Sequence, residues 1–250
     1  MGERVEGIGF WVLALAASCF VGLSKGGLPA VGMLGVPVLS LVISPVTAAG
    51  LLLPVYVVSD MFGLWAYRRA VDRRVLAIMI PATTLGIAMG WATAAMVPER
   101  AVTGLVGLIG AAFALNIILR GTPQGPARAA RVAPGLFWGA LTGFTSFVSH
   151  AGAPPYQVYV LPLKLEKMVF AGTSTVLFAY VNAAKLAPYW ALGQLSAANL
   201  KVAAVLMVPA SIAVLAGVQL VRIIPTVLFF RFVTWALLAV SLKLLWDAAA

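Results

Sequence analysis

The sequence predicts an all-α, polytopic membrane protein. Hydrophobic residues make up 62% of the 250 residues, charged residues make up only 10%, and the mean hydropathy is +1.04. A soluble domain carries roughly 25% charged residues, so this chain has too few charges to cover a surface in contact with water. Intrinsic disorder needs low hydrophobicity and high charge, and a single cysteine, Cys19, cannot support a disulfide-bonded scaffold.

Six segments are long and apolar enough to be simple membrane spans, because about 20 apolar residues cross ~30 Å of hydrocarbon. They are residues 46–66, 75–97, 101–119, 168–188, 200–221 and 226–246. Short charged or proline-containing joints separate these segments. The longest polar stretch, residues 120–134, predicts a linker near the middle of the chain.

Two further regions, residues 8–43 and 135–165, are each too long for one crossing. Glycines and prolines interrupt both regions in the middle, at residues 24–29 (SKGGLP) and 149–155 (SHAGAPP). Such residues stop helices, and non-helical backbone at membrane depth persists only where protein or a cavity surrounds it. We therefore predict two re-entrant helical hairpins whose tips lie inside the membrane, with a second half-helix that begins near Pro29 in the first hairpin.

An internal repeat relates the two halves of the chain. The two breaks align at an offset of 125 residues, and the match continues at offsets of 122 to 128. The matched pairs include Ser24 with Ser149, Lys25 with His150, Gly27 with Gly152, Pro29 with Pro154 and Asp60 with Asn182. Each repeat, residues 1–119 and 135–250, then holds one hairpin and three spans. An odd number of crossings inverts the second repeat, which is an arrangement found in secondary transporters.

The basic residues predict which side of the membrane each joint faces. With the linker in the cytoplasm, eleven of the 17 lysines and arginines fall on the cytoplasmic side, in agreement with the positive-inside rule. Both chain termini are then outside. Five basic residues fall on the outer side: Arg4, Arg100, Lys185, Lys201 and Lys243. The formal net charge of +10 therefore reports topology and not a nucleic-acid partner, and Lys25 alone belongs to neither side because it lies at a hairpin tip.

Lys25 is the most informative charged residue, because an ionised side chain at mid-membrane is costly and usually faces a bundle interior or an aqueous cavity. The flanking glycines can expose backbone N–H groups, and a helix N-terminus carries positive partial charge. Together with His150 at the matching tip, these groups suit a compact oxyanion. The candidate substrate-binding residues are Ser24, Lys25, Gly26, Gly27, Ser149, His150, Gly152, Gln157, Tyr159, Thr173 and Asn182.

Simpler interpretations of these residues stay open. Lys25 could extend to the membrane surface or pair with Asp60, and His150 could be a hydrogen-bonded core histidine. Asp60, the only acid well inside a span, could couple transport to protons, act as a counter-ion of Lys25, or be a buried hydrogen-bonding acid. Its repeat partner Asn182 cannot titrate, and Lys185 follows one helical turn later.

Two pairs of glycines indicate close helix packing. Gly86 and Gly90 are four residues apart, as are Gly139 and Gly143. Small residues at this spacing allow two helix backbones in a bilayer to approach each other closely. We assign these glycines to packing and give them no part in the function.

Enzyme interpretations find little support in the sequence. A Ser24–His150 pair across the two hairpins could form an intramembrane serine hydrolase, but the chain has no Gly-x-Ser-x-Gly elbow. One histidine, one cysteine and one intramembrane aspartate do not make a set of metal ligands. We therefore predict neither an enzyme nor a metal site.

Two sequence motifs resemble the signatures of a known family. The first is residues 22–29 (GLSKGGLP) followed by Val36-Pro37, and the second joins residues 150–155 (HAGAPP) to residues 159–162 (YVLP). Together they resemble the TauE/SafE-type sulfite exporter family, also called the toluene-sulfonate uptake permease family, over about residues 8–246. Further matching elements are Gly172-Thr173-Ser174, Asn182 with Lys185, and Gly193-Gln194.

The resemblance implies a multi-pass transporter of the bacterial inner membrane with no organic cofactor. Its implied substrates are small sulfur-containing anions, namely sulfite, sulfate, thiosulfate and sulfonates such as sulfoacetate. Family members that handle thiosulfate use several cysteines, so the single Cys19 argues against thiosulfate. We expect an exporter embedded in the lipid bilayer that works by alternating access, with the anion between the two hairpin tips and Asp60 coupling transport to protons. A passive anion channel is the alternative.

Overall fold

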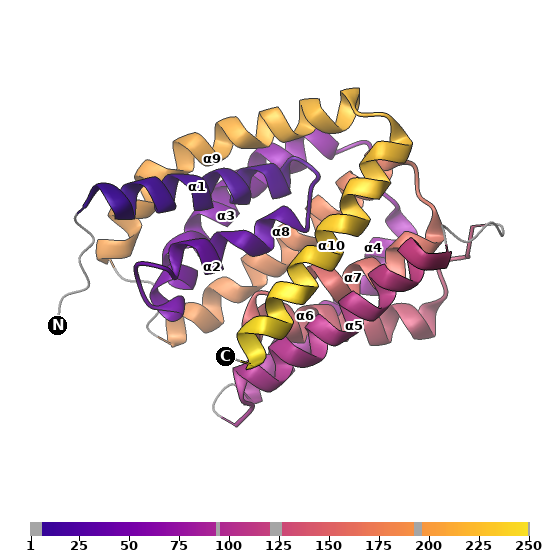
Figure 1. Cartoon of the computed structure of the whole chain (residues 1–250), viewed down its shortest axis with the longest axis horizontal. Coiled ribbons are helices and arrows are strands. Elements are labelled where there is room, and N and C mark those ends of the chain that lie inside the picture. The colour runs from indigo at the N-terminus through magenta and orange to yellow at the C-terminus, as the bar shows by residue number, and fades with distance from the viewer. Residues whose placement is uncertain (1–6, 94–95, 121–126, 193–196, 250) are drawn as a thin grey trace. The chain divides into compact units, whose positions relative to one another are not determined.

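The fold is that of a computed structural model, which describes residues 7–93, 96–120, 127–192 and 197–249 (Figure 1). Within these residues the chain is helical and contains no strand, which confirms the predicted all-α class. The α-helices are α1 (Ile8–Lys25), α2 (Gly35–Leu39), α3 (Pro45–Tyr67), α4 (Arg73–Thr93), α5 (Glu99–Arg120), α6 (Val132–Ser149), α7 (Ala153–Val160), α8 (Lys167–Ala191), α9 (Ala197–Ile223) and α10 (Thr226–Ala249). Arg4, residues 121–126 of the linker and Gly193-Gln194 lie outside the described residues.

Seven of the described helices are long and apolar enough to cross a membrane, so the chain is a multi-pass membrane protein. The candidate spans are Ile8–Lys25, Thr47–Tyr67, Arg73–Thr93, Arg100–Arg120, Lys167–Ala191, Asn199–Ile223 and Thr226–Ala249. Six of them lie within a few residues of the predicted spans. The seventh is α1, which the sequence assigns to a re-entrant hairpin. The re-entrant geometry and the inversion of the second repeat stay predictions.

The first hairpin differs from the prediction after its tip. Helix α1 ends at Lys25, and Gly27 then adopts a φ of 108°, which favours glycine. The chain continues into the 3₁₀ helix η1 (Val31–Leu34), and α2 begins only at Gly35. Helical backbone therefore resumes two residues after Pro29, but as a 3₁₀ turn that becomes α-helical only at Gly35, which corrects the predicted half-helix in type and not in place. The chain is tight here, because a Cβ atom at Gly32 would lie 2.6 Å from the Ser24 side chain.

The second hairpin follows the prediction more closely. Helix α6 ends at Ser149, and His150 takes the left-handed conformation with a φ of 53°. Helix α7 begins three residues later at Ala153, with prolines in its first turn, where a missing N–H group costs little. The 3₁₀ helix η2 (Leu161–Leu163) then closes the hairpin.

The chain forms two compact units that do not coincide with the two halves of the sequence. The first comprises Met1–Arg69 and Ser174–Ile223, and the second comprises Ala70–Thr173 and Ile224–Ala250. Each unit therefore takes helices from both predicted repeats, and α8 contributes to both units. The predicted repeats describe similarity in sequence, whereas the two units describe packing in space. The division into units therefore does not test the repeat boundaries, which stay a prediction.

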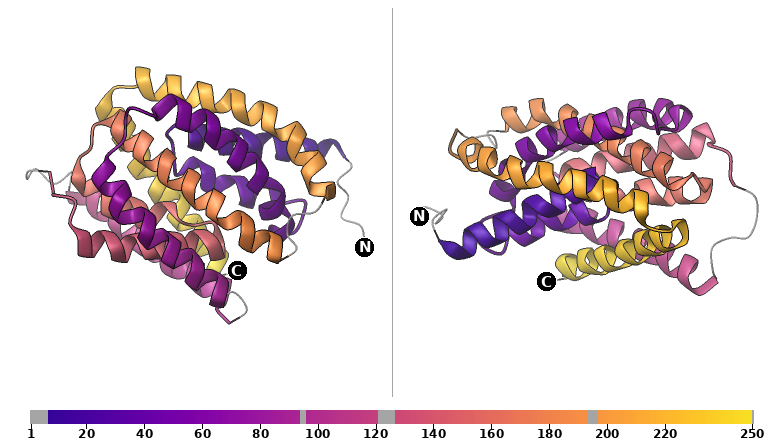
Figure 2. Two further views of the ribbon diagram at one scale, coloured as in Figure 1. Left: turned by 180° about the vertical axis from the view of Figure 1, so that it is seen from behind. Right: turned by 90° about the horizontal axis from the view of Figure 1, so that it is seen from above.

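In the first unit, α9 lies beside α1 and α3. Figure 1 and the right-hand view of Figure 2 show α9 in light orange alongside the indigo α1. The helices approach closely because a Cβ atom at Gly22 would lie 2.1 Å from the Ala210 carbonyl oxygen. Buried apolar side chains from all three helices form the core, among them Val21, Leu52 and Leu206.

In the second unit, α4 packs on α6 and α5 packs on α10. A Cβ atom at Gly86 would lie 2.0 Å from the Ala140 carbonyl oxygen, and one at Gly143 would lie 2.1 Å from the Thr83 carbonyl oxygen. No larger side chain fits at either position without separating the helices. The packing role predicted for these glycines is confirmed.

Candidate functional site

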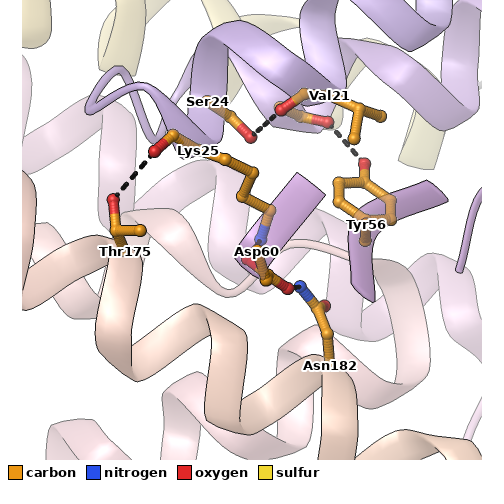
Figure 3. A network of polar contacts seen from close by, with 8 residues as sticks. Val21, Ser24, Lys25, Tyr56, Asp60, Thr175 and Asn182 are labelled. Atoms are coloured by element: carbon orange, nitrogen blue, oxygen red, sulfur yellow. Dashed lines mark hydrogen bonds and ion pairs between the residues drawn. The ribbon is translucent and has the colours of Figure 1, made fainter. Parts of the chain in front are cut away.

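A buried ion pair joins the first hairpin to α3. Lys25 is the last residue of α1, Asp60 lies within α3, and the Lys25 Nζ atom is 2.8 Å from the Asp60 Oδ1 atom (Figure 3). The exposed fractions of the two residues are only 4% and 1%. Of the interpretations that the sequence left open, the structure shows a Lys25 that pairs with Asp60 and does not extend to the surface. Because both ions lose their water on burial, packing alone does not account for such a pair.

The second oxygen of the same carboxylate is held from α8. Asn182 donates a hydrogen bond from its Nδ2 atom to the Asp60 Oδ2 atom over 2.8 Å (Figure 3). Asn182 is itself 6% exposed. Asp60 is thus held by a cation on one oxygen and by an amide on the other, so that each carboxylate oxygen has a partner.

Tyr56 lies one helical turn before Asp60 on α3 and faces Lys25. The Lys25 Nζ atom is 5.1 Å from the centroid of the Tyr56 ring, which is within the range of a cation–π contact. The Tyr56 hydroxyl donates a hydrogen bond to the Gly32 carbonyl oxygen over 2.8 Å. The ring is therefore fixed by the chain that follows the hairpin tip, and it covers one side of the ammonium group.

Lys185 is a second buried cation in this cluster. It lies three residues after Asn182 on α8, is only 2% exposed, and interacts electrostatically with both Lys25 and Asp60. Its Nζ atom is 6.0 Å from the centroid of the Tyr189 ring. The assignment of Lys185 to the outer side stays a prediction, and the structure adds that its side chain lies inside the protein.

The cluster carries a surplus of positive charge when both of its lysines are protonated. In the part of the chain that the structure describes, the fully buried charged side chains are Lys25, Lys185 and Asp60. When both lysines are protonated, two cations share one carboxylate. Uncompensated charge in an apolar interior is unfavourable, so this cluster favours the approach of an anion.

Hydroxyl groups hold the carbonyl end of the first tip. Thr175 donates a hydrogen bond to the Lys25 carbonyl oxygen over 3.2 Å (Figure 3), and Tyr67 donates one to the Gly26 carbonyl oxygen over 2.6 Å. The last carbonyls of a helix have no partner within the helix. These two bonds supply partners from α8 and α3, and they fix the backbone that carries the Lys25 side chain.

The backbone N–H groups of Gly26 and Gly27 at the first tip already donate hydrogen bonds within the protein. Gly26 donates to the Gly22 carbonyl oxygen over 2.9 Å, and Gly27 donates to the Ser24 carbonyl oxygen over 3.2 Å. The Ser24 hydroxyl donates to the Val21 carbonyl oxygen over 2.7 Å. The expectation that these glycines leave N–H groups exposed is wrong for this structure, because the turn folds its donors back onto α1.

The second tip presents a different set of groups. Ser149 donates its hydroxyl hydrogen to a carbonyl oxygen one turn earlier in α6, over 3.2 Å. His150 is half-buried at the turn, and Gly152 precedes α7 without a side-chain cap. Pro154 and Pro155 have no N–H group, so the start of α7 offers fewer donors than a helix N-terminus ordinarily does.

Three further predicted residues of the second half differ in whether their side chains already form hydrogen bonds within the protein. Tyr159 donates a hydrogen bond to the Arg131 carbonyl oxygen over 3.1 Å, and Thr173 accepts one from the Asp72 backbone N–H over 2.8 Å. Gln157 is completely buried, and neither atom of its amide has a hydrogen-bond partner among the described residues. Gln157 therefore retains its full capacity to bind a ligand or water.

The predicted site residues fall into two groups. The structure brings Lys25, Asp60 and Asn182 into direct contact in the first unit, beside the tip residues Ser24, Gly26 and Gly27. The second unit holds Ser149, His150, Gly152, Gln157, Tyr159 and Thr173. That both groups serve one substrate stays a prediction.

Sequence reasoning did not count Tyr56, Tyr67, Thr175 or Lys185 among the candidate binding residues, although it noted Lys185 one turn after Asn182. Two of them carried a usable signal, since Tyr56 precedes Asp60 by four residues and Lys185 follows Asn182 by three. Both spacings place the side chains on one helix face. Tyr67 and Thr175 gave no such signal, because their roles depend on where α1 ends in space.

The fold and the site together define a multi-pass helical membrane protein with buried ionised side chains, a feature that marks ion or substrate pathways in membranes. The family model described as Sulfite exporter TauE/SafE matches residues 14–244, and the chain belongs to this family, as its motifs predict. Comparison with curated proteins and with solved structures found no match. Membership of a transporter family favours transport over the enzymatic alternative.

Proposed function

We propose that this protein is a secondary transporter that exports small sulfur-containing anions, such as sulfite or an organosulfonate, across the bacterial inner membrane. The observation that carries the proposal is the buried cluster in which Lys25 is paired with Asp60 and Lys185 interacts electrostatically with both. A charged residue at mid-membrane costs ~2.5–3.5 kcal/mol on insertion scales. A small anion compensates the surplus charge, and the family description supports sulfur oxyanions as its class.

Lys25 is the principal anion-binding residue in this proposal. An ammonium group has three N–H donors, and the Asp60 carboxylate engages it from one direction. A sulfite or sulfonate oxygen offers the same charge-assisted hydrogen bond as a carboxylate oxygen. Asp60 therefore acts as an internal anion that occupies Lys25 when substrate is absent. Where binding of the anion adds a proton to Asp60, that proton releases Lys25 and couples transport to protons.

The second tip supplies neutral donors in this proposal. Ser149, His150 and Gly152 lie at the turn, and Gln157 follows on α7. A buried polar group without a partner costs about 1–3 kcal/mol, so the unpaired amide of Gln157 supports a polar ligand or water near α7. Ser24, Gly26, Gly27, Tyr159 and Thr173 support the backbone around the two tips through the hydrogen bonds described above.

The contact between Asp60 and Asn182 supports an inverted repeat and alternating access. These residues occupy equivalent positions in the two predicted repeats, and they are hydrogen-bonded to each other. Equivalent positions of two related elements meet where an approximate two-fold axis passes between them. In transporters built from inverted repeats, substrate and coupling ions bind at the repeat interface.

Flux into proteoliposomes tests the proposal. Purified protein should give sulfite flux that saturates with concentration, because each transport cycle passes through a bound state. Flux that does not saturate, together with single-channel currents, would favour a passive anion channel. No sulfite or sulfonate flux above that of protein-free liposomes would contradict transport of this substrate class.

A further inference from the structure

We propose that the cluster of Lys25, Asp60, Asn182 and Lys185 accepts a doubly charged oxyanion together with one proton, which the Asp60 carboxylate takes up. Lys185 then determines the preference for two negative charges over one. The inference rests on the proposed function, because it requires a sulfur anion to reach the cluster. It adds the charge of the substrate and the number of protons that accompany it.

The charge balance of the cluster leads to this proposal. With Asp60 ionised and both lysines protonated, the buried cluster carries one net positive charge. A singly charged anion neutralises it without any change in protonation. A doubly charged anion leaves one negative charge in excess unless Asp60 takes up a proton. Since uncompensated buried charge is disfavoured, a dianion should bind with one proton and a monoanion with none.

The chemistry of the proton transfer is simple. A proton from the aqueous phase adds to one oxygen of the Asp60 carboxylate, and the ion pair with Lys25 is replaced by a contact between Lys25 and the dianion. Asn182 can serve both states, because an amide has both a donor and an acceptor. Its Nδ2 atom donates to the carboxylate in the structure, and after rotation of the amide its Oδ1 atom can accept from the carboxylic acid.

Asp60 is the acid best placed to take this proton. The charged or titratable groups that face it are Lys25 from α1, Tyr56 from its own helix and Lys185 from α8. Helix α9 also packs on α3, but its Lys201 and Arg222 side chains are exposed. Among the described residues, Asp60 is the fully buried carboxylate.

Calorimetry with two anions of fixed charge tests the proposal. Near neutral pH sulfate is a dianion and methanesulfonate is a monoanion of similar size. Titrating each into the full-length protein in buffers of different ionisation enthalpy gives the number of protons bound with the anion. We expect one proton with sulfate and none with methanesulfonate. Equal proton uptake with both anions would overturn the inference.

Variants identify the proton acceptor and the residue that sets the preference. Asp60→Asn should abolish the proton uptake that accompanies sulfate. Lys185→Gln should weaken sulfate relative to methanesulfonate by about 10-fold or more, the loss expected when one charged hydrogen bond is removed. Lys185→Arg, which keeps the charge, should retain the preference, as should the exposed control Lys201→Gln. Proton uptake that survives in Asp60→Asn but disappears in Lys185→Gln would assign the proton to Lys185 and contradict the proposal.

The failure of the inference is distinguishable from that of the proposed function. If sulfate, sulfite and methanesulfonate all fail to bind, the proposed function itself is contradicted. If one or more of them bind but the proton count does not depend on anion charge, transport of sulfur anions stands and only the charge-matching inference falls.

Discussion

Two lysine–aspartate ion pairs in this protein join the same chemical groups in opposite environments. Lys25 and Asp60 come from different helices, and their side chains are 5% and 1% exposed. Lys243 and Asp247 lie one turn apart on α10, and their side chains are 47% and 36% exposed. Water and salt screen the second pair, whereas the first pair is buried among protein side chains.

The difference teaches that contact alone does not reveal what an ion pair does. An exposed pair at this helical spacing contributes about 0.3–0.5 kcal/mol, so we expect its replacement to change stability little. A buried pair is costly to form and more costly to break. Its ions have lost most of their contact with bulk water, so another charged group that reaches them can compete for the pair. The following variants test this contrast, beginning with the largest expected effect.

Removing the lysine of each pair should give the largest difference between the two pairs, measured as sulfite flux. Lys25→Ala should abolish saturable sulfite flux into proteoliposomes, because it removes the cation that faces the substrate. Lys243→Ala should retain the flux of the unchanged protein. Near-normal flux in Lys25→Ala would remove Lys25 from the substrate site, and the helical circular dichroism of each purified variant checks that the protein is folded.

Removing the aspartate of each pair should lower the free energy of unfolding much more for the buried pair than for the exposed pair. Asp60→Ala leaves Lys25 buried without its partner, which typically costs about 3–5 kcal/mol, whereas Asp247→Ala should cost less than about 0.5 kcal/mol. Unfolding in detergent by a denaturant series measures both changes. The double variant Lys25→Ala/Asp60→Ala should recover part of the loss. Equal destabilisation by the two single variants would show that burial does not set the strength of these pairs.

The sequence predicted the parts of the fold that depend on local hydropathy and on the spacing of residues along a helix. Hydropathy located six of the spans, because each is a continuous apolar run. Glycine spacing located the close contacts at Gly86 and Gly143, because only the absence of a side chain matters there. The position of Lys25 inside an apolar region also made its pairing with Asp60 one of the stated alternatives, and the structure shows that pair.

The remainder depends on tertiary contacts that local patterns do not encode. Lys185 lies near the end of its span in sequence, and no local pattern indicates that packing around α8 buries its side chain. The donors of Gly26 and Gly27 were expected to face a ligand, but the tight turn returns them to α1. A glycine-rich segment permits both conformations, and the sequence does not specify which one the surrounding helices select.

Two hydroxyl groups offer a smaller test, because they fix the backbone that positions the buried pair. Thr175→Val and Tyr67→Phe each leave a buried carbonyl oxygen without its donor, which costs about 1–3 kcal/mol. Thr84→Val, on an exposed surface of α4, serves as the control and should change stability by less than about 0.5 kcal/mol. Unfolding free energies measure all three variants. If the buried and exposed variants lose the same stability, these hydroxyls do not hold the tip.

Raising the ionic strength should produce the smallest effect, and it should weaken the coupling energy of the exposed pair only. The coupling energy between Lys243 and Asp247 should fall as ionic strength rises, because exposed charges are screened. The coupling energy between Lys25 and Asp60 should change little. Double-mutant cycles at low and high salt measure both values. A salt-sensitive Lys25–Asp60 coupling would mean that water reaches the buried pair.

Binding of sulfite to the purified protein tests the central claim most directly, namely that the buried cluster is the anion site. A ligand that binds only the folded state raises the unfolding temperature by mass action. Sulfite should therefore raise the unfolding temperature of the unchanged protein and of Lys243→Gln by the same amount, and it should leave that of Lys25→Gln unchanged. An equal sulfite-dependent rise in Lys25→Gln would contradict the account.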